Sequence, residues 1–253
     1  MGPKGSPSGE TRALEPGVMV VVPTFNEQHN VATLVGRTFA ALPDAQIVIV
    51  DDNSPDGTAA TIRRLQADEP RLHLIERSEK QGLGSALIDG LQLGLERGAT
   101  MLVTMDADLS HDPSALPELL AAARSHDLVV GSRYVPGGEI PRWNAFRRAL
   151  SRGGNAYQHA MLRLGVKDAT SGYRAYSATI LRRLDLPGPH LEGFGFQIEM
   201  VRRVKAAGGT VTEVPISFTE REHGESKIDR KTILEALWHV TRWGWSERAF
   251  RKR

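Results

Sequence analysis

Two carboxylates follow an apolar run in the middle of the chain. The run Met101–Val103 is typical of a buried strand, and Asp106 and Asp108 come shortly after it. In an extended segment the side chains of residues i and i+2 point the same way, so both carboxylates can face one cation. Hard oxygen ligands suit Mg²⁺ or Mn²⁺, which such residues often hold through water and a substrate diphosphate. The competing interpretation is a solvated turn, because Asp and Ser are common turn residues.

Strand and helix patterns alternate on both sides of this pair. The sequence predicts strands at Val18–Val22, Ala45–Val50, Arg71–Ile75, Thr100–Met105, Asp127–Val130 and Thr210–Ile216, and helices at Asn26–Leu42, Gly57–Ala67, Gly84–Arg97, Pro113–Arg124, Ala145–Leu164 and Phe194–Ala207. Repeated β-α-β units indicate an α/β fold with a mainly parallel central sheet and helices on both faces.

Ligands of such sheets bind beyond the carboxyl ends of the strands. Polar clusters follow four of the predicted strands, at Pro23–Glu27, Asp51–Thr58, Asp106–Ser110 and Gly131–Tyr134. We therefore expect these clusters to converge on one cleft.

The composition excludes several classes of protein. With 253 residues, 40% hydrophobic and 25% charged, the chain is globular in character. It has no cysteine, which excludes disulfides, thiolate catalysis and cysteine-bound zinc. No run approaches the roughly 20 apolar residues of a membrane span. Residues 1–17 lack an apolar core, so we interpret them as a disordered leader and not as a signal peptide.

The end of the chain is basic and rich in tryptophan. From residue 221 onward nine Lys or Arg stand against five Asp or Glu, a net charge of +4, and three of the four tryptophans lie there (Trp238, Trp243 and Trp245). The spacing predicts an amphipathic helix at Lys231–Phe250 that packs against the domain or lies on a membrane surface. Nucleic acid could use the same charge, but no recognised module supports it, and we expect no nucleic-acid partner.

Seven motifs occur in an order that resembles a known family. They are VPTFNE, VDDNSPDGT, GLGSA, DADLSH, GSRY, SGYRAY and VPISFTEREHGESK. From Val18 to Arg230 the chain resembles the family 2 glycosyltransferases, and specifically the polyprenyl (dolichyl) phosphate mannosyltransferases. The segment Arg221–Lys227 is the most specific of these to lipid-phosphate sugar transfer.

The resemblance implies a GT-A fold over residues 18–230 and inverting transfer of mannose from GDP-mannose to a polyprenyl phosphate. By position, Pro23, Phe25, Glu27, Val50 and Asp52 would hold the guanosine, and Asp106, Ala107 and Asp108 the diphosphate, with Mg²⁺ or Mn²⁺ bound by Asp106, Asp108 and Ser110. Asp108, Arg133, Arg221 and Lys227 would be the catalytic set, the three cations contacting donor phosphates or the reacting phosphate. Two positions depart from the family, with Phe25 where Tyr is frequent and Ser110 where Gln occurs.

Such a reaction needs cations more than it needs a base. A phosphate monoester has its second pKa near about 6, so the acceptor is already an anion at neutral pH. Arg147 and Ser151 lie four residues apart on a predicted helix, hence on one face, and suit the acceptor phosphate. The competing interpretation of Arg147 is a solvated helix face. We expect His111 to position its loop, not to transfer protons.

We expect the enzyme to act peripherally at the cytoplasmic face of a membrane, with an integral membrane protein as partner. Two other functions stay open from the sequence. One is transfer from UDP-glucose or another nucleotide sugar to the same lipid acceptor. The other is a non-catalytic subunit that binds nucleotide, against which the paired Asp residues and the segment Arg221–Lys227 argue.

Overall fold

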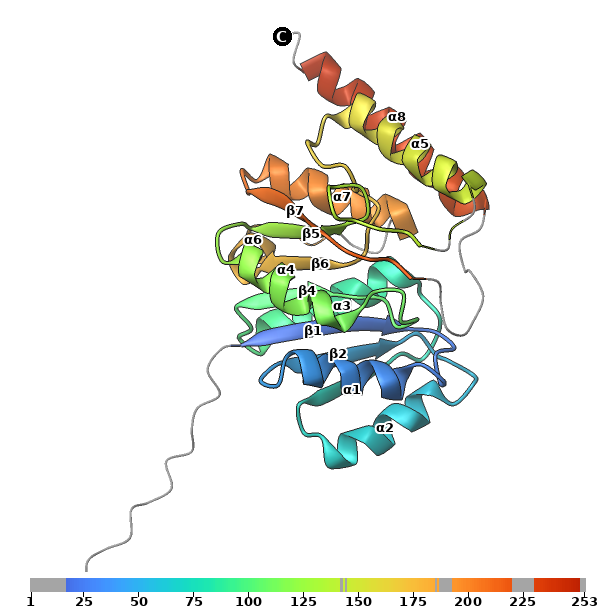
Figure 1. The fold of residues 1–253 in the computed structure, drawn as a ribbon, viewed down its shortest axis with the longest axis vertical. Coiled ribbons are helices and arrows are strands. Elements are labelled where there is room, and N and C mark those ends of the chain that lie inside the picture. The colour runs from blue at the N-terminus through green and yellow to red at the C-terminus, as the bar shows by residue number, and fades with distance from the viewer. Residues whose placement is uncertain are drawn as a thin grey trace, which may run out of the picture.

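The strands assemble into one seven-stranded sheet in the order β3-β2-β1-β4-β6-β5-β7 (Figure 1). A computed structural model describes residues 17–141, 143, 145–184, 186, 193–219 and 230–250, with the backbone alone at 230–233 and 247–250. The strands are β1 (Val18–Thr24), β2 (Gln46–Asp51), β3 (Leu72–Glu76), β4 (Met101–Thr104), β5 (Leu128–Ser132), β6 (Arg174–Ser177) and β7 (Val211–Pro215). Except for the leader's last residue, Gly17, the predicted leader lies outside the described residues.

Helices cover both faces of the sheet. They are α1 (Val31–Ala41), α2 (Thr58–Asp68), α3 (Leu83–Glu96), the short 3₁₀ helix η1 (Pro113–Ala115), α4 (Leu116–Ala123), α5 (Ala145–Leu162), α6 (Ala178–Arg183), α7 (Gly193–Ala206) and α8 (Arg230–Phe250). The α/β class and the mainly parallel sheet predicted from the sequence are confirmed, because among the described strands β6 alone runs antiparallel to its neighbours.

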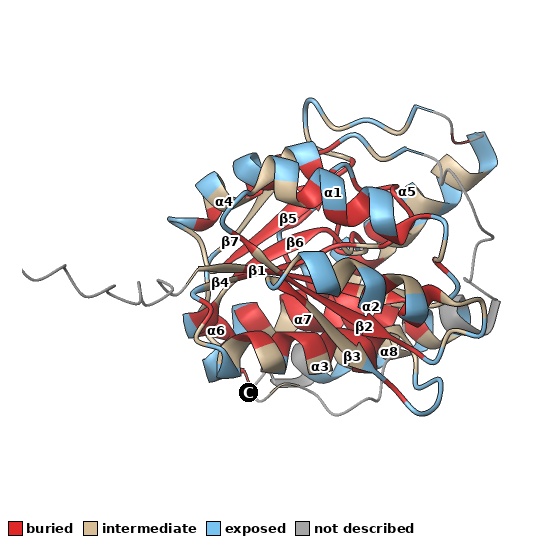
Figure 2. Cartoon of the chain, turned by 90° about the horizontal axis from the view of Figure 1, so that it is seen from below, coloured by how far each residue is buried: buried red, intermediate tan, exposed pale blue. Residues whose placement is uncertain are grey.

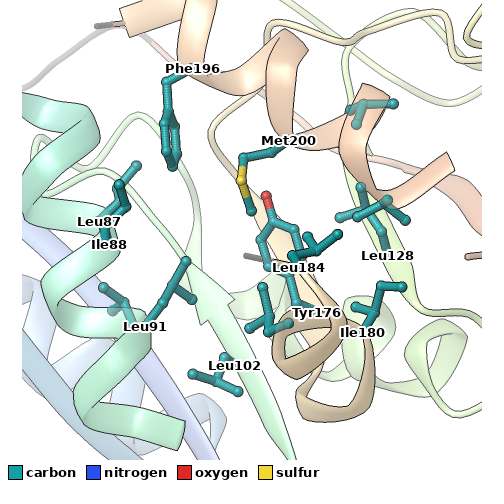
Figure 3. Packing of buried hydrophobic residues seen from close by; sticks show 14 of the residues in the cluster. Leu87, Ile88, Leu91, Leu102, Leu128, Tyr176, Ile180, Leu184, Phe196 and Met200 are labelled. Carbon is teal, nitrogen blue, oxygen red and sulfur yellow. The ribbon is translucent and has the colours of Figure 1, made fainter. Parts of the chain in front are cut away.

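Two apolar layers hold the sheet between the helices. Residues of α1, α2 and α4 pack on one face, and residues of α3, α6 and α7 pack on the other. Figure 2 shows the strands as a buried layer between helices whose outer residues are exposed. In the second layer Leu91 of α3 and Leu102 of β4 face the same core as Phe196 and Met200 of α7 (Figure 3). The central strands are continuous apolar runs because neither face meets water.

Two glycines let α3 approach the sheet closely. A Cβ atom at Gly90 would lie 2.3 Å from Cγ1 of Val21, and one at Gly94 would lie 2.5 Å from Cδ2 of Leu102. Both distances are shorter than any carbon contact tolerates, so larger residues would push the helix away from β1 and β4. The position of α3 matters for the site because its first turn follows Gly82 at the edge of the cleft.

One strand was not predicted from the sequence, and one predicted helix begins at a different residue. β6 lies between β4 and β5, but it has only four residues and begins with Arg174, so it lacks the apolar run that marks a central strand. The predicted helix Asn26–Leu42 begins at Val31 instead. Asn26 has a φ of +57°, in the left-handed region that a right-handed helix excludes, and the segment before Val31 is a turn.

The helices α5 and α8 form a further layer outside α7. They lie side by side and run in parallel (Figure 1), with the Tyr157 hydroxyl 2.6 Å from Oγ1 of Thr241. Gly244 of α8 sits over Met161 of α5, and Arg202 of α7 lies 4.9 Å from the ring centre of Trp243. The predicted C-terminal helix is therefore α8, packed against the domain along part of its length. Within the described ranges no helix has the length and apolar character needed to cross a bilayer.

Candidate active site

The loop after β4 is held rigidly by its own polar groups. Oδ1 of Asp108 accepts hydrogen bonds from the backbone N–H of Ser110 (3.0 Å) and from its hydroxyl (2.5 Å). The backbone N–H of Asp106 donates to Nδ1 of His111 over 3.1 Å. Leu109, between Asp108 and Ser110, has a φ of +62°, a conformation that a leucine adopts only where surrounding contacts enforce it. The loop therefore presents its two carboxylates in a fixed arrangement.

His111 is buried beneath this loop as a neutral ring. It stacks on Tyr173 with 4.9 Å between ring centres, and burial lowers its pKa below the usual 6.5, more than the nearby carboxylates of Asp106 and Asp108 raise it. Because Nδ1 accepts a hydrogen bond from Asp106, the proton of the neutral ring is assigned to Nε2. The expected role of positioning the loop agrees with these contacts.

A first cavity of about 280 Å³ opens at the carboxyl ends of β1, β2 and β4. Of the residues predicted to bind the donor, it is lined by Pro23, Phe25, Glu27, Asp52, Asp106, Ala107 and Asp108. Val50 is not among them, because its side chain is fully buried and its Cγ2 lies against Gly90 of α3. A ligand in this cavity cannot reach the Val50 side chain.

Both carboxylate oxygens of Asp52 already accept hydrogen bonds from other residues of the protein. Oδ1 accepts from the backbone N–H of Gln81 (2.8 Å) and from Nη1 of Arg77 (2.9 Å), and Oδ2 accepts from the N–H of Gly82 (2.8 Å). Asp52 thus fixes the loop that leads into α3. In the same loop Lys80 lies 3.8 Å from the ring centre of Phe25, so this ring carries a cation on one face.

A second cavity of about 550 Å³ lies beneath α5 and α8. Its walls are largely apolar, with Ile198 of α7 and Leu237 and Val240 of α8, and its polar lining includes Arg133 and Arg147. The two cavities share four lining residues, Asp106, Thr170, Gly172 and Phe194. A carboxylate-lined cavity and an apolar, cation-bearing cavity therefore meet beside Asp106.

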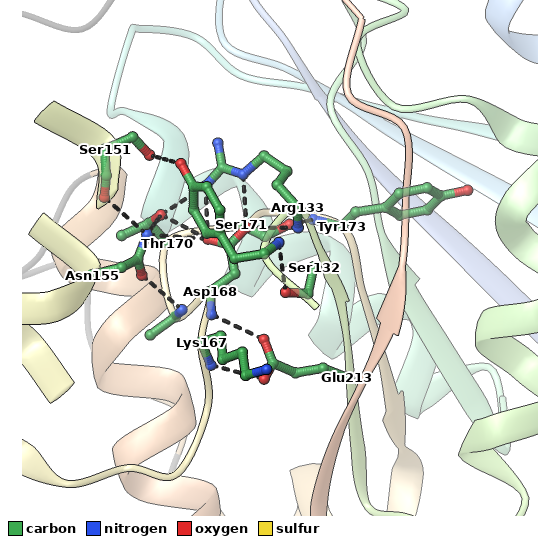
Figure 4. Close-up of polar contacts among 12 residues, drawn as sticks. Ser132, Arg133, Ser151, Asn155, Lys167, Asp168, Thr170, Ser171, Tyr173 and Glu213 are labelled. Carbon is green, nitrogen blue, oxygen red and sulfur yellow. Dashed lines mark hydrogen bonds and ion pairs between the residues drawn. The ribbon is translucent and has the colours of Figure 1, made fainter. Parts of the chain in front are cut away.

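A buried ion pair fixes Arg133 in the wall of the second cavity. Nε and Nη2 each lie 2.7 Å from the carboxylate of Asp168, and Nη2 also donates to Oγ1 of Thr170 (2.8 Å; Figure 4). Burial alone raises the pKa of Asp168, but the Arg133 charge and its hydrogen bonds bring that pKa below 3.8. In the described part of the structure Nη1 of Arg133 has no hydrogen-bond partner. The edge of the guanidinium formed by Nε and Nη2 is thus anchored by Asp168, and Nη1 can bind a ligand.

The predicted acceptor residues lie on one face of α5. Arg147 and Ser151 both line the second cavity, which agrees with their spacing of four. The guanidinium of Arg147 lies 4.1 Å from the ring centre of Trp143, and the Tyr134 hydroxyl donates to Oγ of Ser151 over 2.7 Å. Half-buried against the cavity, Arg147 is not on a fully solvated face.

One predicted metal ligand, Ser110, is not brought to either cavity. Ser110 is fully buried, lines neither cavity and donates its hydroxyl to Asp108. Arg221 and Lys227 lie outside the described residues. Across the described ranges, no three or more His, Asp or Glu side chains gather as a metal cluster. A divalent ion would therefore need ligands from the substrate in addition to Asp106 and Asp108.

Comparison with known sequences decides the family. A sequence profile described as Glycosyl transferase family 2 matches residues 19–185, more than half of the chain. The chain belongs to this family. It is therefore a glycosyltransferase, as the motifs predicted.

Curated relatives of this glycosyltransferase align over nearly its whole length. An undecaprenyl-phosphate mannosyltransferase from Micrococcus luteus is 46% identical over 231 residues, which cover 91% of this chain and 95% of the relative. A polyprenol monophosphomannose synthase from Mycolicibacterium smegmatis is 45% identical and covers 89% and 86%. A dolichol-phosphate mannosyltransferase from Pyrococcus furiosus is 37% identical and covers 89% and 63%.

Solved structures share the fold of this glycosyltransferase. Glucosyl-3-phosphoglycerate synthase from Mycobacterium tuberculosis, with Mn²⁺, UDP and glucosyl-3-phosphoglycerate, matches with a TM-score of 0.64 and 17% identity over 93% of this chain and 86% of that chain. A mannosyltransferase from Pyrobaculum calidifontis, in complex with GDP-Man and Mn²⁺, matches with a TM-score of 0.53 and 18% identity over 89% and 69%. The expected GT-A fold is confirmed by these matches, which at such identities concern the fold alone.

Several residues that build the site of this glycosyltransferase were not predicted from the sequence. Arg77 directly follows β3, so the rule that singled out the other strand ends would have found it. Lys80 lies three residues further on, over Phe25. Asp168 carried no such signal, because its partner Arg133 is 35 residues away in the sequence and only the folded chain brings the two together.

Proposed function

We propose that the protein transfers mannose from GDP-mannose to a polyprenyl phosphate, with inversion at the anomeric carbon. The observation that carries this proposal is the junction of two unlike cavities at Asp106, one lined by carboxylates and the other apolar with arginines. The names of the three curated relatives, all of which describe mannose transfer to a lipid phosphate or its product, support it.

The first cavity suits the donor. Phe25 and Lys80 can stack on and flank a nucleotide, and Glu27 lies in the same lining. Asp108 is oriented by Ser110, while the Asp106 side chain is 38% exposed at the cavity junction, so the two can share a divalent ion with a substrate diphosphate. Oxygen ligands of this kind fit Mg²⁺ or Mn²⁺, and Mn²⁺ is present in two structures of the same fold. When bound, the ion neutralises charge on the leaving diphosphate.

The second cavity suits the acceptor. Its apolar walls can bury prenyl units, and Arg133, Arg147 and Ser151 provide donors for a phosphate at one end. Because Asp168 already holds Arg133 in place, ligand binding at Nη1 does not carry the entropy cost of ordering this side chain. Arg221 and Lys227 remain proposed contacts to the donor phosphates or the reacting phosphate.

Transfer then needs alignment and charge stabilisation. A phosphate oxygen of the acceptor attacks the anomeric carbon, a new C–O bond forms, and the bond to GDP breaks with its electron pair leaving on GDP. Because the acceptor oxygen is already anionic, no side chain has to remove a proton. Inversion requires the acceptor oxygen to attack the anomeric carbon from the side opposite the leaving group. The arginines hold the two anions together.

The lipid acceptor implies contact with a membrane surface. All the large apolar residues that are strongly exposed in the described structure lie on α5 and α8, namely Phe146, Leu150, Leu234, Leu237, Trp238 and Trp245. Leu150 and Leu237 also line the second cavity, so this apolar surface borders the proposed lipid site. Arginines on the same helices, such as Arg147 and Arg242, suit lipid phosphates. We place the protein at the cytoplasmic face, with an integral membrane protein as its partner.

A donor panel tests the proposal. The full chain, incubated with Mg²⁺, mixed polyprenyl phosphates and either radiolabelled GDP-mannose or UDP-glucose, is extracted with organic solvent. Label from GDP-mannose in the lipid fraction is expected. Label from UDP-glucose alone would overturn the choice of sugar, and GDP binding without label from either donor would favour a non-catalytic subunit.

A further inference from the structure

Arg174 is a fully buried cation with an unusual set of partners. Nε donates to the carbonyl of Ser171, Nη2 to that of Ala169 and Nη1 to that of Gln197, each over 2.7 Å. Nη1 also lies 3.3 Å from the Tyr176 hydroxyl. No carboxylate pairs with this guanidinium within the described residues. Burying a charge without a counter-charge is costly, so the arrangement calls for a physical reason.

The carbonyls that bind Arg174 fix the direction of two N–H groups. In a trans peptide the N–H points opposite to the C=O of the same unit, and no described peptide bond is cis. Since the carbonyls of Ala169 and Ser171 point at Arg174, the N–H groups of Thr170 and Gly172 point away from it. In the described structure neither N–H has a hydrogen-bond partner. Such groups are normally satisfied, so a ligand or water is expected to accept from them.

These two residues lie where the cavities meet. Thr170 and Gly172 line both cavities, whereas Ser171 lines the second alone and the neighbouring Ala169 and Tyr173 line neither. Gly172 leaves the junction open, because a Cβ there would lie 3.3 Å from Oδ1 of Asp106 and 3.5 Å from Nε2 of Gln197. Its backbone is not among those with positive φ, so a glycine at this position provides space.

We propose that the N–H groups of Thr170 and Gly172 bind non-bridging oxygens of the acceptor phosphate, and that Arg174 is the positioning residue that aims them. This proposal rests on the proposed function. Backbone N–H groups that point toward the same side of a loop can bind an anion, and a buried positive charge behind them strengthens the attraction. The acceptor phosphate is the anion of choice because Oγ1 of Thr170 already accepts from Arg133, which lines the acceptor cavity and not the donor cavity.

Amide NMR of the full chain tests the assignment directly. The ¹⁵N-labelled protein is titrated with farnesyl phosphate in the presence of GDP and Mg²⁺, and farnesol, which lacks the phosphate, is the matched control. Downfield shifts of the Thr170 and Gly172 amide protons are expected with farnesyl phosphate only. If the amides of Ser151 and Ile198 shift but those of Thr170 and Gly172 do not, this assignment is wrong and the acceptor cavity stands. If farnesyl phosphate shifts no amide at all, the proposed function falls with it.

Two substitutions give an independent readout. Gly172→Ala should weaken farnesyl phosphate binding about tenfold or more, because the methyl group displaces the phosphate from charge-assisted hydrogen bonds. Gly36→Ala on α1, where a Cβ meets nothing within 4 Å, is the matched control and should leave binding unchanged. Arg174→Lys keeps the charge but lacks the planar guanidinium that reaches the three carbonyls at their separate positions, so farnesyl phosphate affinity should fall more than GDP affinity. Unchanged farnesyl phosphate binding in both Gly172→Ala and Arg174→Lys would overturn the proposal.

Discussion

The carboxylate of Asp168 holds the guanidinium of Arg133 through two hydrogen bonds of 2.7 Å; both side chains are buried, and Arg133 lines the acceptor cavity. Asn155 and Glu213 support the same group, because the amide of Asn155 lies 3.4 Å from Oδ1 of Asp168 and Glu213 accepts from the backbone N–H of Asp168 over 2.9 Å (Figure 4). Asp168 thus fixes the position of the Arg133 guanidinium.

Removing the Asp168 carboxylate should therefore destabilise the folded protein, because Arg133 would stay buried without a counter-charge. Asp168→Ala leaves Arg133 buried without a partner, and we expect the free energy of unfolding to fall by about 3 kcal/mol. Arg133→Met in the same chain should recover part of that loss. Urea unfolding measures both, and Arg63→Ala, which breaks an exposed pair with Glu76, should cost less than about 1 kcal/mol. Equal losses for Asp168→Ala and Arg63→Ala would contradict the account.

The same pair predicts a pH dependence of stability. The pKa of Asp168 is lower in the folded protein than its usual 3.8, so its stabilising contribution is fully present above about pH 4 and is lost as pH falls through the folded pKa. The stability difference between the wild type and Asp168→Asn should shrink below about pH 4. Urea midpoints of both proteins measured from pH 7 to pH 3 test this. A stability difference that grows as the pH falls would contradict the prediction.

Asp108 and Ser110 should differ in their effect on turnover. Asp108→Ala removes a carboxylate from the donor cavity, and we expect turnover to fall by about two orders of magnitude or more. Ser110→Ala removes a hydrogen bond to Asp108, so a loss of about tenfold is expected. Initial rates at saturating Mg²⁺, with melting temperatures as the folding control, measure both. Wild-type turnover in Asp108→Ala would refute its role, and equal losses would make Ser110 a direct ligand, as the sequence resemblance implied.

The apolar surface of α5 and α8 predicts separable membrane binding. Leu234 and Trp238 are 66% and 57% exposed and do not line the acceptor cavity. Replacing both with Ser should weaken co-sedimentation with vesicles of anionic and neutral phospholipid by about tenfold or more. Turnover of farnesyl phosphate in solution should stay within about twofold. Arg64→Ser on α2 serves as the control, and unchanged vesicle binding in the double variant would remove this surface from the account.

The parts of the fold that the sequence predicted are those in which local chemistry repeats. β1, β2 and β4 are continuous apolar runs because both faces are covered, and the cluster that follows each of them lines the first cavity. β6 was missed because Arg174 is charged yet fully buried, and its partners are carbonyls that the sequence does not mark. A pattern of residue types cannot reveal a cation that is satisfied by the backbone.

The sequence predicted the carboxylates of the site but not the residues that orient them. Asp106 and Asp108 stand out because acids seldom follow a buried strand without a use. Asp52 was identified by position, yet its oxygens bind Arg77 and the loop before α3. Val50 was carried over in the same way, but the close approach of α3 at Gly90 buries its side chain. These differences come from tertiary packing between segments that are remote in the sequence.

The central claim is that a lipid phosphate in one cavity meets a sugar nucleotide in the other at Asp106. A mass spectrum of the lipid extract after incubation of the full chain with GDP-mannose, Mg²⁺ and a mixed pool of polyprenyl phosphates tests it most directly. The account predicts polyprenyl phosphates heavier by one hexose residue, formed by the wild type and lost in Asp108→Ala. A lipid pool of unchanged mass, despite intact GDP-mannose binding, would contradict it.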